Sequence, residues 1–239
     1  MDKDILKNIG NNLEREFLNH NYLPQKLGIE DLTMGLKLFI ESFNLSLLME
    51  NGINRRVPVV FVPNELFAER KMHWKDMRAE NGEEMSRPFI VLIRTAVKKG
   101  TSPIKYTIPN KKRFKFIKVP VFDGTLKGYD LYKVPQPTWI DIDFEIKFVT
   151  HYAEDIDAFN EMMLDKIYSS GQGYMNINGH AIASKMNGDP NDESSLDDIN
   201  AERLYQVSYP ITVLGKLIDP TEFEKINTIK KISIKITEK

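Results

Sequence analysis

Apolar residues recur at the spacing of an α-helix in three stretches of the chain. The first predicted helix spans residues 1–23, stops before Pro24 and has one apolar face: Ile5, Ile9, Leu13 and Phe17. The second spans residues 64–78 and begins at Asn64, a residue type that favours the N-cap. The third spans residues 155–169 and carries four apolar residues on one side: Ile156, Phe159, Met163 and Ile167.

In other stretches apolar and polar residues alternate, which predicts strands with one buried and one solvated face. The longest alternation covers residues 139–149, and five residues form its apolar face: Ile140, Ile142, Phe144, Ile146 and Phe148. A second predicted strand has four inward residues: Val207, Tyr209, Ile211 and Val213. Residues 89–97 are apolar almost throughout, and residues 232–236 alternate again, so both stretches are also predicted as strands.

Two Asn-Gly pairs stand between strand-like segments. The tight two-residue turn of a β-hairpin needs positive φ at both central residues, which Asn and Gly tolerate. Asn51-Gly52 therefore predicts a hairpin over residues 42–62. Asn178-Gly179 predicts a second hairpin over residues 174–186.

Runs of strands joined by hairpins, with few helices, predict an α+β fold with a mixed or antiparallel β-sheet and flanking helices. No linker rich in proline, glycine or serine divides the chain, so residues 1–239 are predicted to form a single domain. Proline and glycine are frequent in residues 120–137, which predicts irregular structure there. We accordingly expect long excursion loops over residues 98–137, with a strand where residues 111–118 alternate, and an acidic loop over residues 188–202.

Composition limits the class of protein. The chain has 239 residues, of which 41% are hydrophobic, and a net charge of −1, so it is expected to build a core and is not basic as a whole. It has no cysteine, which excludes disulfides and thiolate metal sites and suits a reducing cytoplasm. The most apolar stretch, residues 32–49, is interrupted by Lys37 and Glu41, and residues 1–7 lack the apolar segment of a secretory signal. We therefore expect a soluble protein.

Sequence motifs for catalysis or cofactor binding are absent. There is no glycine-rich phosphate loop, no nucleophile elbow and no HExxH helix, and the four histidines lie far apart in the sequence. Asp141 and Asp143 share one face of a predicted strand, which suits either a divalent ion or the solvated face of an amphipathic strand. The loop from Asp189 lacks the glycine and glutamate of a calcium-binding EF-hand. We predict no catalytic residue, no cofactor and no metal site, and hence no enzyme.

Charge is distributed unevenly along the chain. Residues 98–118 contain eight basic residues and no acidic one: Lys98, Lys99, Lys105, Lys111, Lys112, Arg113, Lys115 and Lys118. Residues 188–202 contain six acidic residues and no basic one, and five of them are candidate contact residues: Asp189, Asp192, Glu193, Asp197 and Asp198. The basic segment could contact a phosphate backbone, form a solvated surface, or meet the acidic segment across a subunit boundary.

Five segments in a fixed order resemble the tail-terminator proteins of long-tailed phages, which complete the tail and stabilise its sheath, and the neck ring proteins of crAss-like phages. The segments are VPVVFVPNELFAERK, RPFIVLIRTAV, PNKKRFKFIKVP, YKVPQPTWIDIDFEIKFVTHYAEDIDAFNEMML and YMNINGH. The resemblance covers residues 44–182 and is one of pattern, without catalytic residues. It implies a ring of identical subunits, six- or twelve-fold, that surrounds a DNA passage.

The resemblance therefore predicts a structural virion protein, assembled in the bacterial cytoplasm, that joins head-side and tail-side proteins in the phage neck. Its partners would be copies of itself, neighbouring neck, portal or tail proteins and passing DNA, and no membrane. Two other hypotheses come from the residues alone. One is a nucleic-acid-binding protein that uses residues 98–118, and the other is a metal-dependent hydrolase built on Asp141 and Asp143.

Overall fold

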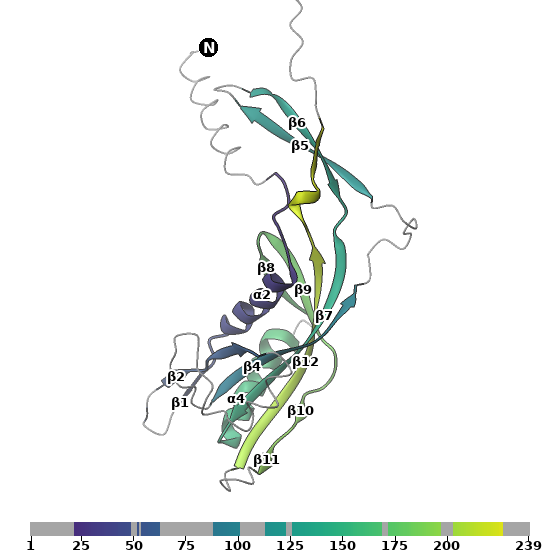
Figure 1. Ribbon diagram of the computed structural model, residues 1–239. Coiled ribbons are helices and arrows are strands. Elements are labelled where there is room, and N and C mark those ends of the chain that lie inside the picture. Colours follow the sequence, from purple (N-terminus) through teal and green to yellow (C-terminus); the bar gives the residue numbers. More distant parts are fainter. Residues whose placement is uncertain are drawn as a thin grey trace, which may run out of the picture. The chain divides into compact units, whose positions relative to one another are not determined.

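Two compact units make up the fold, which is given by a computed structural model (Figure 1). Unit 1 comprises Met1–Lys26, Ile104–Thr138 and Ile218–Lys239, and unit 2 comprises Leu27–Pro103 and Trp139–Leu217. The structure describes residues 22–48, 52, 54–62, 88–100, 113–122, 126–168, 172–196 and 203–226. The predicted helices at residues 1–23 and 64–78 and the predicted closing strand at residues 232–236 lie outside these ranges, apart from residues 22 and 23.

The predicted α+β fold class is confirmed, with strands as the dominant element. Unit 2 contains an eight-stranded mixed sheet in which six strands follow the order β3-β4-β7-β12-β9-β8, while β10 and β11 pair with β12. The pairing of β3 with β4 is parallel, and the other pairings given for this sheet are antiparallel. The strands in that order are Val59–Phe61, Phe89–Lys99, Thr138–Thr150, Arg203–Leu217, His180–Met186 and Gln172–Ile177.

The apolar face of β7 is the centre of the unit 2 core, as the alternation predicts. All five of its inward residues are buried: Ile140, Ile142, Phe144, Ile146 and Phe148. Helix α4 (Ala153–Met163) packs on this face, because the rings of Phe148 and Phe159 stack with centroids 4.7 Å apart. Tyr209 of β12 meets Phe159 edge-on and donates a hydrogen bond of 2.6 Å from its hydroxyl to Oδ1 of Asn160.

The predicted helix at residues 155–169 is therefore present, although its second half differs from a regular helix. After α4 the chain continues as a π-helical turn, Leu164–Tyr168. Phe159, Met163 and Ile167 are buried, whereas Ile156 is only half-buried.

The second face of β7 is more covered than its polar sequence suggests. Lys147 is buried, and Asp141, Asp143 and Glu145 are half-buried, so the prediction of a solvated face was wrong at Lys147 and is only partly met from Asp141 to Glu145. At one end this face carries its own apolar cluster: Val62, Phe89, Val91, Ile93, Val149 and Leu204. Because the sheet is covered on both faces there, residues 89–93 of β4 are apolar without alternation.

Helix α2 (Ile29–Glu41) was not anticipated. Its buried residues Leu32, Leu36 and Ile40 recur four apart, and the carboxylate of Asp31 accepts a hydrogen bond of 2.8 Å from the backbone N–H of Gly28 at the N-cap. The alternation that begins at Phe43 predicted strand structure from residue 42, and residues 29–41 were assigned to no element. The helix lies close to β8, since a Cβ atom added to Gly35 would clash with the side chain of Ile177 (Figure 1).

The Asn178-Gly179 hairpin is confirmed. Strands β8 and β9 pair up to Ile177 and His180, which leaves a two-residue turn with φ of 50° at Asn178 and 74° at Gly179.

The first predicted hairpin is confirmed only in part. β1 (Ser46–Leu48) pairs with β2 (Asn54–Arg56), with Leu48 opposite Asn54, so five residues instead of two separate the paired strands. Gly52, one of the five, has the positive φ that was predicted, at 74°. The rest of the predicted segment leaves the hairpin, because β3 pairs with β4 in the large sheet. Pro58, which has no N–H to donate, separates β2 from β3, and its carbonyl accepts from the N–H of Ile90 at 2.9 Å.

Unit 1 contains a three-stranded antiparallel sheet in the order β13-β6-β5. Its strands are Glu224–Ile226, Leu126–Pro135 and Phe114–Phe122. The prediction of irregular structure at residues 120–137 was therefore wrong, while the strand predicted at residues 111–118 overlaps β5. The N–H of Gln136 donates to the carbonyl of Arg113 at 2.7 Å, which makes 113 and 136 a hydrogen-bonded pair. By alternation the missing N–H of Pro120 points away from β6, so this proline does not interrupt the ladder.

The predicted acidic loop at residues 188–202 is also partly strand. β10 (Asn191–Asp192) and β11 (Ser195–Leu196) pair with β12. Polar contacts of Glu193, described below, hold this segment against the sheet. No helix among the described residues is long and apolar enough to cross a membrane.

The turn at Gly179 gives a test of the fold. Gly179→Ala forces a side chain into the left-handed region, so we expect it to destabilise the protein by about 1 kcal/mol. Gly188→Ala is the matched control, because Gly188 is not among the positive-φ glycines and its added Cβ would lie 3.8 Å from Cγ of Pro210, an ordinary contact. Urea denaturation of both variants measures the difference, and equal midpoints would contradict the turn conformation.

Candidate functional site

The predicted basic block is divided between the two units. Lys98 and Lys99 end strand β4 of unit 2, and the ammonium of Lys98 forms an ion pair with Asp143. Three other members of the block are exposed on or next to β5 of unit 1: Arg113, Lys115 and Lys118. Lys105, Lys111 and Lys112 lie outside the described residues.

Of the predicted acidic contact residues, Asp189 and Asp192 are exposed, and Asp197 and Asp198 lie outside the described ranges. The carboxylate of Asp192 accepts from both the N–H and the hydroxyl of Ser194, at 2.9 and 2.5 Å. In this local turn the carboxylate of Asp192 provides an acceptor for the backbone N–H of Ser194, which follows β10 in the chain.

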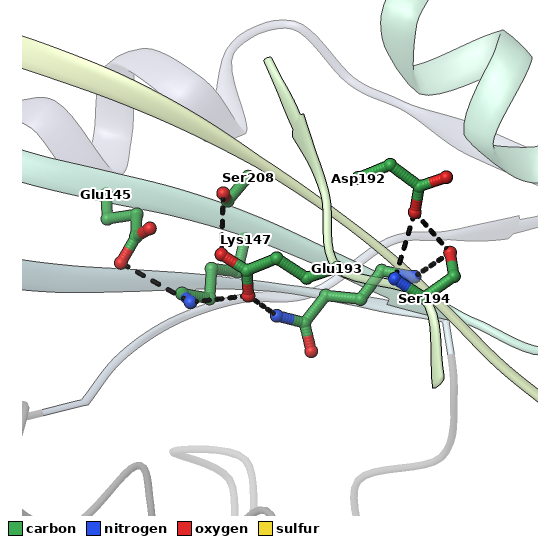
Figure 2. A network of polar contacts seen from close by, with 7 residues as sticks. Glu145, Lys147, Asp192, Glu193, Ser194 and Ser208 are labelled. Atoms are coloured by element: carbon green, nitrogen blue, oxygen red, sulfur yellow. Dashed lines mark hydrogen bonds and ion pairs between the residues drawn. The ribbon is translucent and has the colours of Figure 1, made fainter. Parts of the chain in front are cut away.

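Glu193 has a different role from its acidic neighbours, because its side chain points inward (Figure 2). One carboxylate oxygen lies 2.8 Å from Nζ of the buried Lys147 and accepts from the amide of Gln206, and the other accepts from the hydroxyl of Ser208 at 3.0 Å. Lys147 belongs to β7 and Gln206 to β12, so the side chain of Glu193 reaches across β12 to its neighbour. A second carboxylate, that of Glu145 on β7 itself, lies 3.4 Å from Nζ of Lys147.

This network anchors the acidic segment to the sheet. A buried ammonium is costly unless paired, and Lys147 has a carboxylate on either side. The sequence suggested that Glu193 contacts an external partner, and that contact stays a prediction, but the structure shows a second role for its carboxylate within the sheet. Its neighbours in the sequence are surface residues, but Glu193 makes its contacts within its own chain.

Asp141 and Asp143 do not form the paired-carboxylate site that the sequence left open. Asp143 pairs with Lys98 and accepts a hydrogen bond of 2.6 Å from the hydroxyl of Thr212. Burial alone raises the pKa of Asp143, but the hydrogen bonds from Lys98 and Thr212 and the charges of Lys98 and Lys185 outweigh it and hold the pKa below 3.8. Within the described part of the chain, no three histidine or acidic side chains lie close enough to hold a metal ion.

Exposed apolar side chains provide the stronger candidate for a functional surface. The first group lies on one face of the unit 1 sheet, here called the aromatic face: Phe114, Phe116 and Tyr129, each about half exposed. Cross-strand register places the three on the same face, because Phe116 stands opposite Lys133 and Tyr129 opposite Pro120. The ammonium of Lys133 lies 4.1 Å from the centre of the Phe114 ring, which holds this ring in place at the surface.

A second group of exposed apolar residues lies along a groove between α2 and β8 of unit 2, here called the α2–β8 groove. Its volume is about 370 Å³. Met34, Leu38 and Tyr174 are the strongly exposed members, at 49, 57 and 67%. The groove is further lined by Asp31, Gly35, Phe39, Ser42, Met175, Asn176, Ile177 and Asn178.

The sequence carried a signal for this groove that the prediction missed. Met34 and Leu38 are four residues apart, and so are Leu32 and Leu36, which means that α2 has apolar residues on an outer face as well as on its core face. The spacing alone does not show which of the two pairs is buried, because both recur four residues apart and only the packing of α2 distinguishes them. No family model matches this chain, and no curated protein matches it, so its surfaces must be interpreted from their own chemistry.

The anchoring role of Lys147 can be tested directly. Lys147→Met leaves the carboxylate of Glu193 without its cation, and we expect a loss of about 1–3 kcal/mol in the free energy of unfolding. Lys98→Met is the control, because the Lys98 side chain is 64% exposed and its removal should cost less than about 1 kcal/mol. Urea denaturation measures the unfolding free energy of both variants. If Lys147→Met is no less stable than Lys98→Met, Lys147 does not anchor the acidic segment.

Asp143 gives a pH-dependent test. Its pKa is lowered in the folded protein, so the charged carboxylate stabilises the fold above its ordinary pKa of 3.8, and that contribution is lost as the pH falls through the folded value. Asp143→Asn should therefore be less stable than the wild type at pH 7 by about 0.5 kcal/mol. The difference in unfolding free energy between the wild type and Asp143→Asn should shrink as the pH is lowered from about 5 to about 2. A difference that is constant or grows with acidity would argue against the lowered pKa.

Proposed function

We propose that this protein is a structural subunit that assembles with copies of itself, and that its working form is a homo-oligomeric ring in the neck or tail connector of a tailed phage. The observation that carries the proposal is the distribution of exposed apolar residues. Ten large apolar side chains are exposed among the described residues, and six of them fall in the aromatic face and the α2–β8 groove. Grouped apolar exposure is typical of interaction surfaces, whereas scattered exposure is ordinary.

The phage setting rests on the order of sequence segments that resembles the tail-terminator and neck ring proteins. The fold is compatible with such a role, since a strand-rich core with a small additional sheet offers several surfaces to neighbours. The basic residues exposed along β5 could face either an acidic neighbouring protein or passing DNA in such a ring. A ring of identical subunits needs two different surfaces that fit one another.

Ion pairs within the unit 1 sheet make nucleic-acid binding a weaker hypothesis than assembly. Lys133 pairs with Glu224 at 2.8 Å, and Lys225 pairs with Asp130 at 2.6 Å. The hydrogen bond from Lys225 to Asp130 raises the pKa of Lys225, as expected for an ammonium that is held by a carboxylate. Neither lysine belongs to the segment 98–118, but their pairing lowers the positive field around Arg113, Lys115 and Lys118 that a phosphate backbone would require.

Assembly is tested on the purified full-length chain. Mass photometry and sedimentation velocity should show one discrete oligomer above the monomer mass, and negative-stain images should show a ring. A protein that stays monomeric up to high micromolar concentration would refute the proposal. Binding to DNA that weakens steeply with added salt, by a protein that remains monomeric, would favour the nucleic-acid hypothesis instead.

A further inference from the structure

We infer that the aromatic face of one copy docks into the α2–β8 groove of the next copy, in a head-to-tail contact. The inference rests on the proposed assembly and names the two surfaces that would form it. One surface is an edge strand with protruding rings, and the other is a groove with apolar walls. Both are carried by every copy, so each subunit can serve as insert and as receptor.

The geometry of β5 makes it suitable as the insert. β5 is the last strand of the three-stranded sheet, and 113 and 136 form a hydrogen-bonded pair with β6. By alternation, the backbone groups of Phe114, Phe116 and Lys118 point away from β6, toward the edge of the sheet. The same two phenylalanines present their rings on the aromatic face, so the edge offers apolar surface and backbone hydrogen-bonding groups together.

The groove offers matching chemistry. Its walls are largely apolar, and no lysine or arginine lines it. Asp31 lies in its lining, and Glu30 beside it is exposed in the same first turn of α2, so one end of the groove is acidic. Aromatic rings from β5 would bury against Met34, Leu38 and Tyr174. The exposed ammonium group of Lys118, which lies on the same face of β5 as the two phenylalanines, would approach the acidic end.

Charge complementarity is the reason for choosing a second copy as the occupant. The insert has exposed basic residues, the groove has an acidic end, and both belong to one chain. An isologous contact between two β5 edges would instead bring Lys115 and Lys118 of each copy near the same residues of the other, which is unfavourable. A heterologous contact between different surfaces closes into a ring when the rotation per subunit allows it.

The experiment uses one variant for each surface. Phe114→Ser with Phe116→Ser alters the insert, and Met34→Lys with Leu38→Lys alters the groove; all four side chains are about half exposed, so the fold should persist, which circular dichroism and the melting temperature would check. Leu164→Ser is the matched control, because Leu164 is 49% exposed and belongs to neither surface. Each double variant should lose assembly by at least about tenfold in association constant, while Leu164→Ser assembles as the wild type does.

Mixing the two double variants gives the decisive measurement. One intact insert and one intact groove remain between them, so the mixture should form a heterodimer and no larger species, as seen by mass photometry. If the wild type assembles but both variants assemble equally well, or if the mixture forms no dimer, this contact is wrong while the proposed function stands. If the wild type is monomeric, as it would be if insert and groove met within one chain or if the aromatic face bound nucleic acid, the contact and the proposed function both fail.

Discussion

Unit 2 depends on the burial of β7 on both of its faces. A strand in this position must supply apolar side chains on one side and leave no polar group without a partner on the other. The first requirement is met by the alternation from Ile140 to Phe148, which packs under α4. The second is met at Asp143 by Thr212 and Lys98 and at Lys147 by Glu145 and Glu193, whereas the indole N–H of Trp139 on the same face has no partner among the described residues.

That second face explains the placement of the acidic segment. Glu193 reaches over β12 to Lys147, and the backbone of residues 191–196 then pairs with β12 through β10 and β11. One buried ammonium therefore orders a stretch that its composition alone would assign to a solvated loop. A segment with many carboxylates can therefore pack against a sheet instead of forming a solvated loop, if one of its carboxylates pairs with a buried cation.

A fold of this kind does not specify a function by itself, because the same layers of sheet and helix serve many proteins. Two exposed apolar surfaces that the core does not explain favour assembly instead. In unit 1, Lys133 supports the Phe114 ring from the same face, so this ring is exposed in a defined position. In unit 2, α2 approaches β8 closely at Gly35 and leaves Met34 and Leu38 outside the contact. A surface ring that is held in position, as Phe114 is, loses little conformational entropy on binding, which favours a specific interface.

Sequence alone determined the elements whose signal is local. The alternation of β7, the apolar face of the helix around Phe159 and the φ requirement at Asn178-Gly179 depend on nearest neighbours along the chain, and each appears where the pattern predicts it. Tertiary structure decided what depends on distant partners. Pro120 lies within a strand because the neighbouring strand sits on the side where its N–H is not needed, β3 leaves its hairpin to pair with β4, and Glu193 turns inward to Lys147. No local pattern encodes these choices, because each is set by the chain segment that arrives beside it.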